Sequence, residues 1–424
     1  MTDVDGDWLR RVRRDLHRHP EPAWCEFYTT DYIARELDEL GVDYELGAGF
    51  LAADSRLGVP DEGTLEEWAE RAREAGASEG TLDACAGGFT GLLATVERGE
   101  GPTITLRVDI DGLPRAESES PEHTPVKEGF RSETPAMHAC GHDAHAAIGL
   151  GVLRALVDHD FAGTLRVLFQ PAEETAGGAK PVAESGVLDD TDYLFAVHVG
   201  LEHPTGELVA GIEEFLAVRQ FRAEFSGESS HAGAKPEAGR NAVQAMATAI
   251  QNLYGIARHG DGATRVNAGR VGGGSAANIV PDESFIEGEV RGENTELMEY
   301  VYGRAETVLE SAATMYDCSV SIETRGEAPS AESDDELRAV VRTSGEHTSG
   351  VERILSRDAL GGSEDATYLM DRVQSHGGLA TYVGVGTDHP GGHHSATFDV
   401  DERTLDIAVG VLADAIETTF AERP

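Results

Sequence analysis

The order of apolar and polar positions predicts alternating strands and helices in the first half of the chain. Short apolar runs at 89–96, 103–109, 164–169 and 193–197 predict strands. Apolar residues recurring at three to four positions predict helices over 8–40, 64–75, 143–157 and 175–184, with Thr64 as a helix cap, and 115–136 reads as a loop. This alternation indicates an α/β fold with a mostly parallel sheet, like the catalytic domain of zinc exopeptidases.

A different order of elements begins near Gly211. Strands are predicted at 215–225, 265–269, 284–291 and 319–324, and helices at 241–257 and 295–315. The order β-α-β-β-α-β is the ferredoxin-like split-βαβ arrangement. We therefore expect an inserted α+β lid domain over 213–325, between two parts of a catalytic domain at 1–212 and 326–424, and a last helix over 402–420.

Charge is the strongest compositional feature of the chain. The formal net charge is −43 over 424 residues, and the lysines are only Lys127, Lys180 and Lys235. Such a surface repels phosphate, which argues against a nucleic-acid partner. An acidic face for a cationic ligand is one interpretation. The acids are spread along the whole chain, however, which favours halophilic solvation and a need for high salt.

The sequence predicts a protein of the cytoplasm without a membrane span. No stretch reaches the ~18 uninterrupted apolar residues that a membrane helix needs. The first residues are acidic and lack the basic and apolar regions of a signal peptide. The four cysteines are widely spaced and form no Cys-x-x-Cys pair, which suits a reducing compartment.

Side chains suited to transition metals concentrate in Met137–His145, where four of nine residues are His or Cys. A tight turn at Gly141 can direct Cys140 and His142 to one ion. Further candidates follow predicted strands: the pair Glu173 and Glu174, then His198, and later His393 and His394. We predict a metal site built from loops at strand ends.

Several roles stay open at this level. One of Glu173 and Glu174 can bind metal while the other acts as a base, or both can be a solvated helix start. Asp109 can hold a ligand imidazole in the right tautomer or be a turn acid. Further histidines are equally ambiguous: His145 has the same alternatives, His138 is expected to be structural, and either His393 or His394 can be the ligand.

The number of candidates indicates two ions and hydrolysis. Five candidate ligands are more than one open tetrahedral site uses, namely Cys140, His142, Glu174, His198 and His394. A thiolate or carboxylate can bridge two ions that activate water. The sequence contains no Gly-x-Ser-x-Gly elbow and no phosphate-binding Walker loop, so serine hydrolysis and nucleotide chemistry are not indicated.

The insertion carries candidates for contact with a substrate. His231, in Ser230-His231-Ala232-Gly233, can stabilise a developing oxyanion or be a plain surface histidine. Arg240, Asn278 and Arg291 are candidates for holding a substrate carboxylate, which suits the bidentate arginine fork. Most arginines in a salt-adapted chain nevertheless face solvent.

These residues together resemble the M20 metallopeptidase and amidohydrolase family. The resemblance lies in Met137–His145, Pro171–Glu174, His198–Gly200, Ser230–Gly233 and His394 with Phe398-Asp399. It is closer to the branch of aminoacylases, hippurate hydrolases and auxin-conjugate hydrolases, and closer still to p-aminobenzoyl-glutamate hydrolases. The closer likeness rests on Ser55–Glu62, Gly87–Gly91, Ala234–Glu237 and Gly362–Thr367. Ser395-Ala396-Thr397 departs from the broader branch, which leaves the substrate less certain.

The resemblance implies specific roles. Cys140, His142, Glu174, His198 and His394 would bind two divalent ions, Mn²⁺ or Zn²⁺. Glu173 would be the general base, and His231 would reach an active site from the lid, often that of a partner chain. It also implies a homodimer, or a heteromer with a related M20 protein, formed through the lid.

The function expected from all this is hydrolysis of an N-acyl or N-aroyl amino acid, with an aroyl-glutamate such as p-aminobenzoyl-glutamate as the best candidate. Another aminoacylase or auxin-conjugate type of hydrolase, or a dipeptidase, is the first alternative. A non-catalytic partner chain of a heteromeric hydrolase is the second, and the intact set of ligands counts against it.

Overall fold

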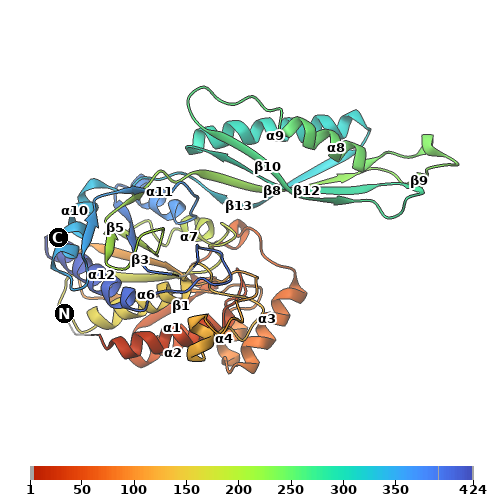
Figure 1. Cartoon of the computed structure of the whole chain (residues 1–424). Coiled ribbons are helices and arrows are strands. Elements are labelled where there is room, and N and C mark those ends of the chain that lie inside the picture. The colour runs from red at the N-terminus through yellow and green to blue at the C-terminus, as the bar shows by residue number, and fades with distance from the viewer. Residues whose placement is uncertain (1–3, 390, 423–424) are drawn as a thin grey trace. The chain divides into compact units, whose positions relative to one another are not determined.

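The computed structural model describes residues 4–389 and 391–422, which form two compact units (Figure 1). The first comprises the described residues up to Glu213, residues 331–360 and those from Asp365 onward. The second combines residues 214–330 with 361–364. The sequence pattern placed the insertion at 213–325; residues 361–364 join it from a later part of the chain, which no local pattern indicates.

The first unit is built on an eight-stranded mixed sheet. In spatial order its strands are β1 Asp43–Leu46, β2 Leu92–Glu97, β4 Thr164–Gln170, β3 Thr103–Asp109, β5 Tyr193–Val199, β16 Leu379–Val385, β6 Glu207–Val209 and β14 Arg353–Leu355. The central strands β4, β3, β5 and β16 are parallel, whereas β1 and β2 run antiparallel at one side. The prediction of a mostly parallel α/β sheet is confirmed.

Helices pack on both faces of this sheet (Figure 1). One layer holds α1 Gly6–Arg18, α2 Phe27–Leu40, α6 His142–Leu156, α10 Asp335–His347 and α12 Arg403–Glu422. Phe195, Val197 and Val199 of β5 join the apolar core with these helices. The alternate residues Leu194 and Ala196 are buried on the other face, where α7 Ala179–Ser185 contacts α11 Thr367–Ser375.

Shorter elements complete the first unit. They are the 3-10 turns η1 Gly47–Gly49 and η2 Ala53–Ser55, the helices α3 Glu62–Glu74, α4 Glu79–Ala84 and α5 Thr124–Glu128, and the parallel pair β7 Ile212–Glu213 and β15 Asp358–Ala359. The expected loop over 115–136 therefore contains a helical turn. The cap of α3 is Asp61, which accepts the N–H of Thr64 at 3.1 Å, and not Thr64 as predicted.

Two predicted helices are shorter than the pattern indicated. The helical run expected over 8–40 is divided between α1 and α2, because Pro20 and Pro22 cannot supply backbone donors there. The helix expected at Thr175 starts at Ala179. Residues 173–176 form a turn instead, and a Cβ on Gly178 would lie 1.7 Å from the carbonyl oxygen of Pro171, so this glycine packs against the backbone.

The second unit is a four-stranded antiparallel sheet with two helices on one face (Figure 1). The sheet order is β10 Thr264–Gly273, β12 Glu283–Gly292, β8 Ala217–Ser226 and β13 Ser319–Ala328. α8 Ala242–Leu253 and α9 Thr295–Met315 bury their apolar sides against it. A short ladder of β9 Ser230–His231 with β11 Ile279–Val280, and the turn η3 Pro236–Ala238, extend from this split-βαβ core.

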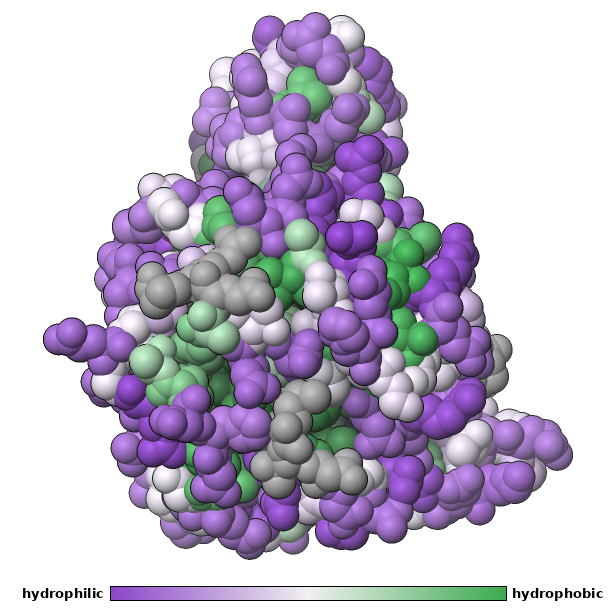
Figure 2. Space-filling model, turned by 90° about the vertical axis from the view of Figure 1, so that its left-hand side faces the viewer, coloured by the Kyte–Doolittle hydropathy of each residue, from purple (hydrophilic) through white to green (hydrophobic). Residues whose placement is uncertain are grey.

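Hydrophilic side chains dominate the face drawn in Figure 2, with hydrophobic ones in small separate patches. Among the residues that the structure describes, no helix is long and apolar enough to cross a membrane.

Candidate metal centre

Gly141 determines the geometry of Cys140 and His142. Its φ is 84°, in the left-handed region that glycine occupies without strain, and it is the N-cap of α6. A Cβ at this position would lie 2.7 Å from Cγ2 of Val199. The predicted turn is therefore present, and a larger residue would strain it. Cys140 and His142 flank the turn, and both are buried.

Cys140 lies at the centre of two groups of possible metal ligands. Its Sγ is 3.4 Å from Nε2 of His198, and these two atoms form one group with His393. The second group joins Cys140 to Glu174 and His394, whose Nε2 lies 3.3 Å from Oε2 of Glu174. Within each group the donor atoms lie within 4.8 Å of one another. Residues far apart in the sequence therefore meet around one thiol.

His142 faces carboxylates on both sides of its ring. Nδ1 lies 3.3 Å from Oδ1 of Asp111, and Nε2 lies 4.0 Å from Oε2 of Glu173. Nε2 is buried and makes no hydrogen bond within the part of the chain that the structure describes. Burial lowers the pKa of this imidazole, but Asp109, Asp111 and Glu174 raise it to about 10. Carboxylates that favour a proton at Nε2 also favour a divalent cation there, so His142 fits the role of a ligand.

His198 is ready to bind a cation through Nε2. It lies within β5, not after the strand as the sequence suggested. Its Nδ1 donates to the carbonyl oxygen of Val199 at 2.8 Å, which leaves the lone pair on Nε2 toward Cys140. Burial and the neighbouring His145 and His393 hold the pKa of His198 well below its usual range. The imidazole is therefore neutral, the form that binds metals.

His145 holds other residues in place rather than offering a free nitrogen. Nδ1 forms a short hydrogen bond with Asp109, and Nε2 accepts the N–H of Val199 at 2.9 Å. Both ring nitrogens are thus used, although Asp109, His142 and His145 together have the spacing of a ligand group. His145 links the end of β3 to the residue after His198, which matches the supporting role that the sequence left open for both His145 and Asp109.

The two adjacent histidines near the C-terminus have different surroundings. Nε2 of His393 accepts the N–H of Leu201 at 3.1 Å, and its Nδ1 lies 3.4 Å from Sγ of Cys140. Burial lowers the pKa of His393 to about 3, so the ring is neutral and its proton sits on Nδ1, facing the sulfur. His394, at a φ of 62°, directs Nε2 to Glu174 instead. This geometry favours His394 as the ligand.

Asp111 belongs to the site, although the sequence reasoning did not name it. Its Oδ1 accepts the N–H of Glu173 at 3.1 Å, and its Oδ2 accepts the N–H of Glu174 at 3.0 Å. With His142 on the same carboxylate, Asp111 connects three candidates of the centre. The signal in the sequence is the second acid of Asp109-Ile110-Asp111, directly beyond a buried strand.

A buried network behind Asp109 was also missed. Arg107, fully buried, donates from Nη1 to Asp109 at 2.6 Å, from Nε to Gln170 at 2.8 Å and from Nη2 to Asp365 at 3.2 Å. Oδ2 of Asp365 accepts the N–H groups of Gly178 and Ala179 at 3.2 and 2.9 Å, where α7 begins. Burial raises the pKa of Asp109, but His142, Arg107 and His145 outweigh it and hold that pKa well below the usual range.

The substrate candidates of the inserted segment belong to the second unit. His231 is exposed in β9, where its Nδ1 accepts the N–H groups of Gly233 and Ala234, both at 3.1 Å. Arg240 pairs with Glu228 at 3.0 Å, and Asn278 accepts the N–H of Ala232 through its backbone carbonyl at 2.9 Å.

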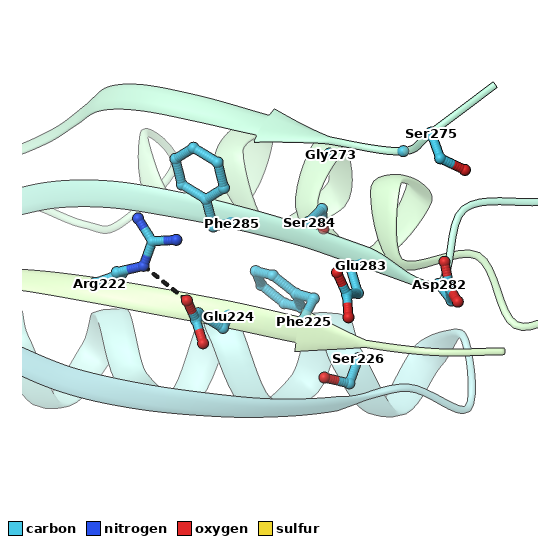
Figure 3. A pocket seen from close by; sticks show the side chains of 11 residues that line it. Arg222, Glu224, Phe225, Ser226, Gly273, Ser275, Asp282, Glu283, Ser284 and Phe285 are labelled. Carbon is cyan, nitrogen blue, oxygen red and sulfur yellow. Dashed lines mark hydrogen bonds and ion pairs between the residues drawn. The ribbon is translucent and has the colours of Figure 1, made fainter. Parts of the chain in front are cut away.

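Arginines on the sheet of the second unit are already engaged by acids. Arg291 donates to both oxygens of Glu289, at 2.9 and 3.0 Å, and to Ser363. A pocket on the same sheet has a volume of about 370 Å³, and Figure 3 shows Arg222 in it beside Glu224, at 2.8 Å. Phe285 lies under the Arg222 guanidinium. The cation of this pocket is neutralised within the chain.

The family model of peptidase family M20/M25/M40 matches residues 105–418. This range includes every candidate ligand and most of the chain. The chain belongs to this family. The resemblance predicted from the motifs is confirmed, and the mixed α/β fold with its inserted split-βαβ unit is the fold of M20 proteins.

Relatives in the M20 family extend over nearly the whole chain. An indole-3-acetyl-aspartic acid hydrolase of Enterobacter agglomerans is 45% identical over 96% of this chain and 94% of its own. One of the named subunits of the p-aminobenzoyl-glutamate hydrolase of Escherichia coli K12 is 43% identical over the same shares, 96% and 94%. The chain is accordingly a metal-dependent amidohydrolase of the M20 type, as predicted.

Solved structures agree with this assignment. An aminobenzoyl-glutamate utilization protein from Klebsiella pneumoniae superimposes with a TM-score of 0.84 at 36% identity, over 98% of both chains. The YXEP protein of Bacillus subtilis, described as a dinuclear metal-binding peptidase of the M20 family, gives a TM-score of 0.66 at 25% identity, also over 98% of both.

Proposed function

We propose that this M20 hydrolase cleaves the amide bond between an acyl or aroyl group and an acidic amino acid, with p-aminobenzoyl-glutamate-like compounds as its best substrates. The observation that carries the proposal is the meeting of Cys140 and Glu174 with the histidine donors, beside Glu173. Two relatives at 43–45% identity are named for amides of aspartate and glutamate, which supports the acidic amino acid.

The ligands in this proposal are Cys140, His142, Glu174, His198 and His394. Two divalent ions there, Mn²⁺ or Zn²⁺, would polarise the amide carbonyl and lower the pKa of a water molecule. Thiolate and imidazole suit zinc, and the carboxylate also suits manganese. Nδ1–H of His393 would support the thiolate of Cys140, and His145 with Asp109 would keep the histidine side of the centre in place.

Glu173 is the proposed general base. Asp111 accepts its backbone N–H, and its Oε2 lies 4.0 Å from Nε2 of His142, so the carboxylate is directed toward the centre. It would take a proton from the attacking water and pass it to the nitrogen of the leaving amino acid. Asp109 would serve catalysis indirectly, by orienting His145.

The second unit is proposed to act as a lid and to mediate assembly. His231 would stabilise the oxyanion that develops on the substrate carbonyl. The exposure of its side chain suits a residue that meets a substrate or a neighbouring chain. This unit would form a homodimer, or a heteromer with a related M20 protein, and the relative from Escherichia coli, named as one component of a larger enzyme, supports a partner. Arg240, Asn278 and Arg291 remain proposed contacts to a substrate carboxylate.

The proposed setting is a reducing, salt-rich cytoplasm. Cys25, Cys85, Cys140 and Cys318 are all free thiols in the structure. A net charge of −43 without a basic partner surface in the sequence fits a halophilic solvation layer.

The test is a hydrolysis panel on the purified chain in high salt, with metal content measured on the same sample. We expect release of glutamate or aspartate from aroyl and indole-acyl conjugates with about two bound ions per chain. Full metal content without turnover of any acyl amino acid would contradict the proposal and favour a non-catalytic partner chain. Faster turnover of dipeptides would favour an exopeptidase.

A further inference from the structure

Arginines of this chain are usually matched by carboxylates, as expected with 34 basic and 77 acidic residues. Arg222 and Arg291 show the pattern in the second unit. In the first unit, the buried Arg13 donates to Asp143 at 2.7 Å and to Asp399 at 2.6 Å. An arginine without an acidic partner in this chain is therefore unusual.

Arg115 is such an arginine. Its side chain is partly buried, and its Nε is buried without a hydrogen-bond partner among the described residues. No carboxylate of those residues lies within ion-pair distance of its guanidinium. A desolvated guanidinium nitrogen without an acceptor is unfavourable, so this group gains from an anionic ligand that supplies one.

The backbone places Arg115 beside the metal centre. Leu113 and Met137 exchange two backbone hydrogen bonds, at 2.9 and 3.0 Å, three residues before Cys140. Further along, the N–H of Ser118 donates to the carbonyl of Ala396 at 2.9 Å, two residues after His394. Arg115 thus lies in a loop held at one end against the Cys140 turn and at the other against the His394 turn.

The charge of Arg115 reaches this centre. The pKa of His394 is lowered first by burial, then by His142 and then by Arg115. The Arg115 cation is therefore close enough to act electrostatically on a candidate ligand. A substrate whose amide carbonyl is at the centre would bring its own carboxylate groups into the same region.

We infer that Arg115 binds a carboxylate of the substrate's amino acid and so contributes to its specificity. The inference rests on the proposed function. A planar guanidinium can form two parallel hydrogen bonds to a carboxylate, which selects an anion by geometry as well as charge. In a chain with a net charge of −43, a local cation is needed to accept a dianionic aroyl-glutamate. The ligand is either the α-carboxylate, common to all such substrates, or the acidic side chain.

The experiment compares Arg115→Gln with wild type on p-aminobenzoyl derivatives of glutamate, glutamine and alanine. The matched control is Arg98→Gln, which removes an exposed arginine whose guanidinium donates to the carbonyl of Val157. We expect Arg115→Gln to raise KM about 10- to 100-fold with little change in kcat, and Arg98→Gln to match wild type. An increase for glutamate alone identifies the side-chain carboxylate, and an equal increase for all three identifies the α-carboxylate.

Three results would overturn the inference. Equal kinetics of Arg115→Gln and Arg98→Gln, with an active wild type, would show that Arg115 faces solvent and leaves the proposed function standing. Loss of bound metal in both Arg115→Gln and Arg115→Lys would show a purely structural role. A metal-loaded wild type that cleaves none of the three derivatives would remove the proposed function and this inference with it.

Discussion

Arg107 and Asp365, 258 residues apart in the chain, form a buried ion pair with Nη2 3.2 Å from Oδ1. Both side chains are fully excluded from solvent. The same guanidinium holds Asp109 at 2.6 Å, and Asp109 in turn is hydrogen-bonded to His145. The residue at which the chain returns from the second unit, Asp365, is thereby connected to the histidines of the metal centre.

Replacing Asp365 by Asn should therefore affect both stability and metal binding. Removing one partner of a buried ion pair costs roughly 3 kcal/mol of the free energy of unfolding, because the remaining charge is left unbalanced. We also expect weaker metal binding, since Asp109 loses part of its support. The control is Asp334→Asn, whose carboxylate accepts the N–H of Ala380 at 2.8 Å away from this network. Equal metal affinity of the two variants would contradict the coupling.

Glu173→Gln should abolish turnover while bound metal is retained. The amide keeps the size of the side chain but cannot take up the proton, and loss of a general base costs about 100- to 10,000-fold in rate. The measurements are kcat and metal content on one preparation. Glu174→Gln, which alters a proposed ligand, should instead lower the metal content. An active, metal-loaded Glu173→Gln enzyme would refute the role of base.

His145→Ala should weaken metal binding without removing it. Because both ring nitrogens of His145 are used, by Asp109 and by Val199, the variant loosens the ligands rather than deleting one. Removal of such supporting groups typically costs about 10- to 100-fold in metal affinity. His142→Ala deletes a proposed ligand and should cost more. Equal losses for the two variants, measured by competition with a chelator, would mean that His145 is itself a ligand.

Stability should fall between neutral and alkaline pH because of His17. Nδ1 lies 2.8 Å from Asp143, and Nε2 lies 3.0 Å from Glu117. Burial and Arg13 lower the pKa of His17, but the two carboxylates raise it, to about 9 from 6.5. A pKa raised in the folded state stabilises fully below pH 6.5, and this contribution is lost as the pH rises to about 9.

The loss should amount to roughly 3 kcal/mol at most, and His17→Gln should remove this part of the pH dependence. The measurement is the free energy of unfolding at fixed salt from pH 6.5 upward. His138, whose pKa burial lowers to about 3, affects stability only below pH 6.5, so it does not interfere. An unchanged slope in His17→Gln would contradict the assignment.

Salt should stabilise the fold strongly. With a net charge of −43, self-repulsion acts over ~10 Å at 0.1 M salt and over only ~3 Å at 1 M. Thermal unfolding in KCl between about 0.1 and 2 M should show a rising midpoint and recovery of activity. Full activity and stability in low salt would contradict the halophilic interpretation.

Local patterns predicted most elements of the fold. The helix expected over 295–315 and the strand over 103–109 have those bounds in the structure. Both are long or continuous runs whose period is set by neighbours in the chain. The errors lie where distant groups decide, as in the turn at 173–176, where Asp111 and the packing of Gly178 replace a predicted helix start.

The sequence by itself determined which residue types were available and where backbone conformation was special. Gly141 with Cys140 and His142 was legible because a tight turn, a thiol and an imidazole are local properties. The tertiary structure alone decided which nitrogen of each imidazole is occupied, and that Asp111, Arg107 and Asp365 support the centre. Hydrogen bonds between residues up to 258 positions apart depend on how strands and loops meet in space, which no local periodicity records.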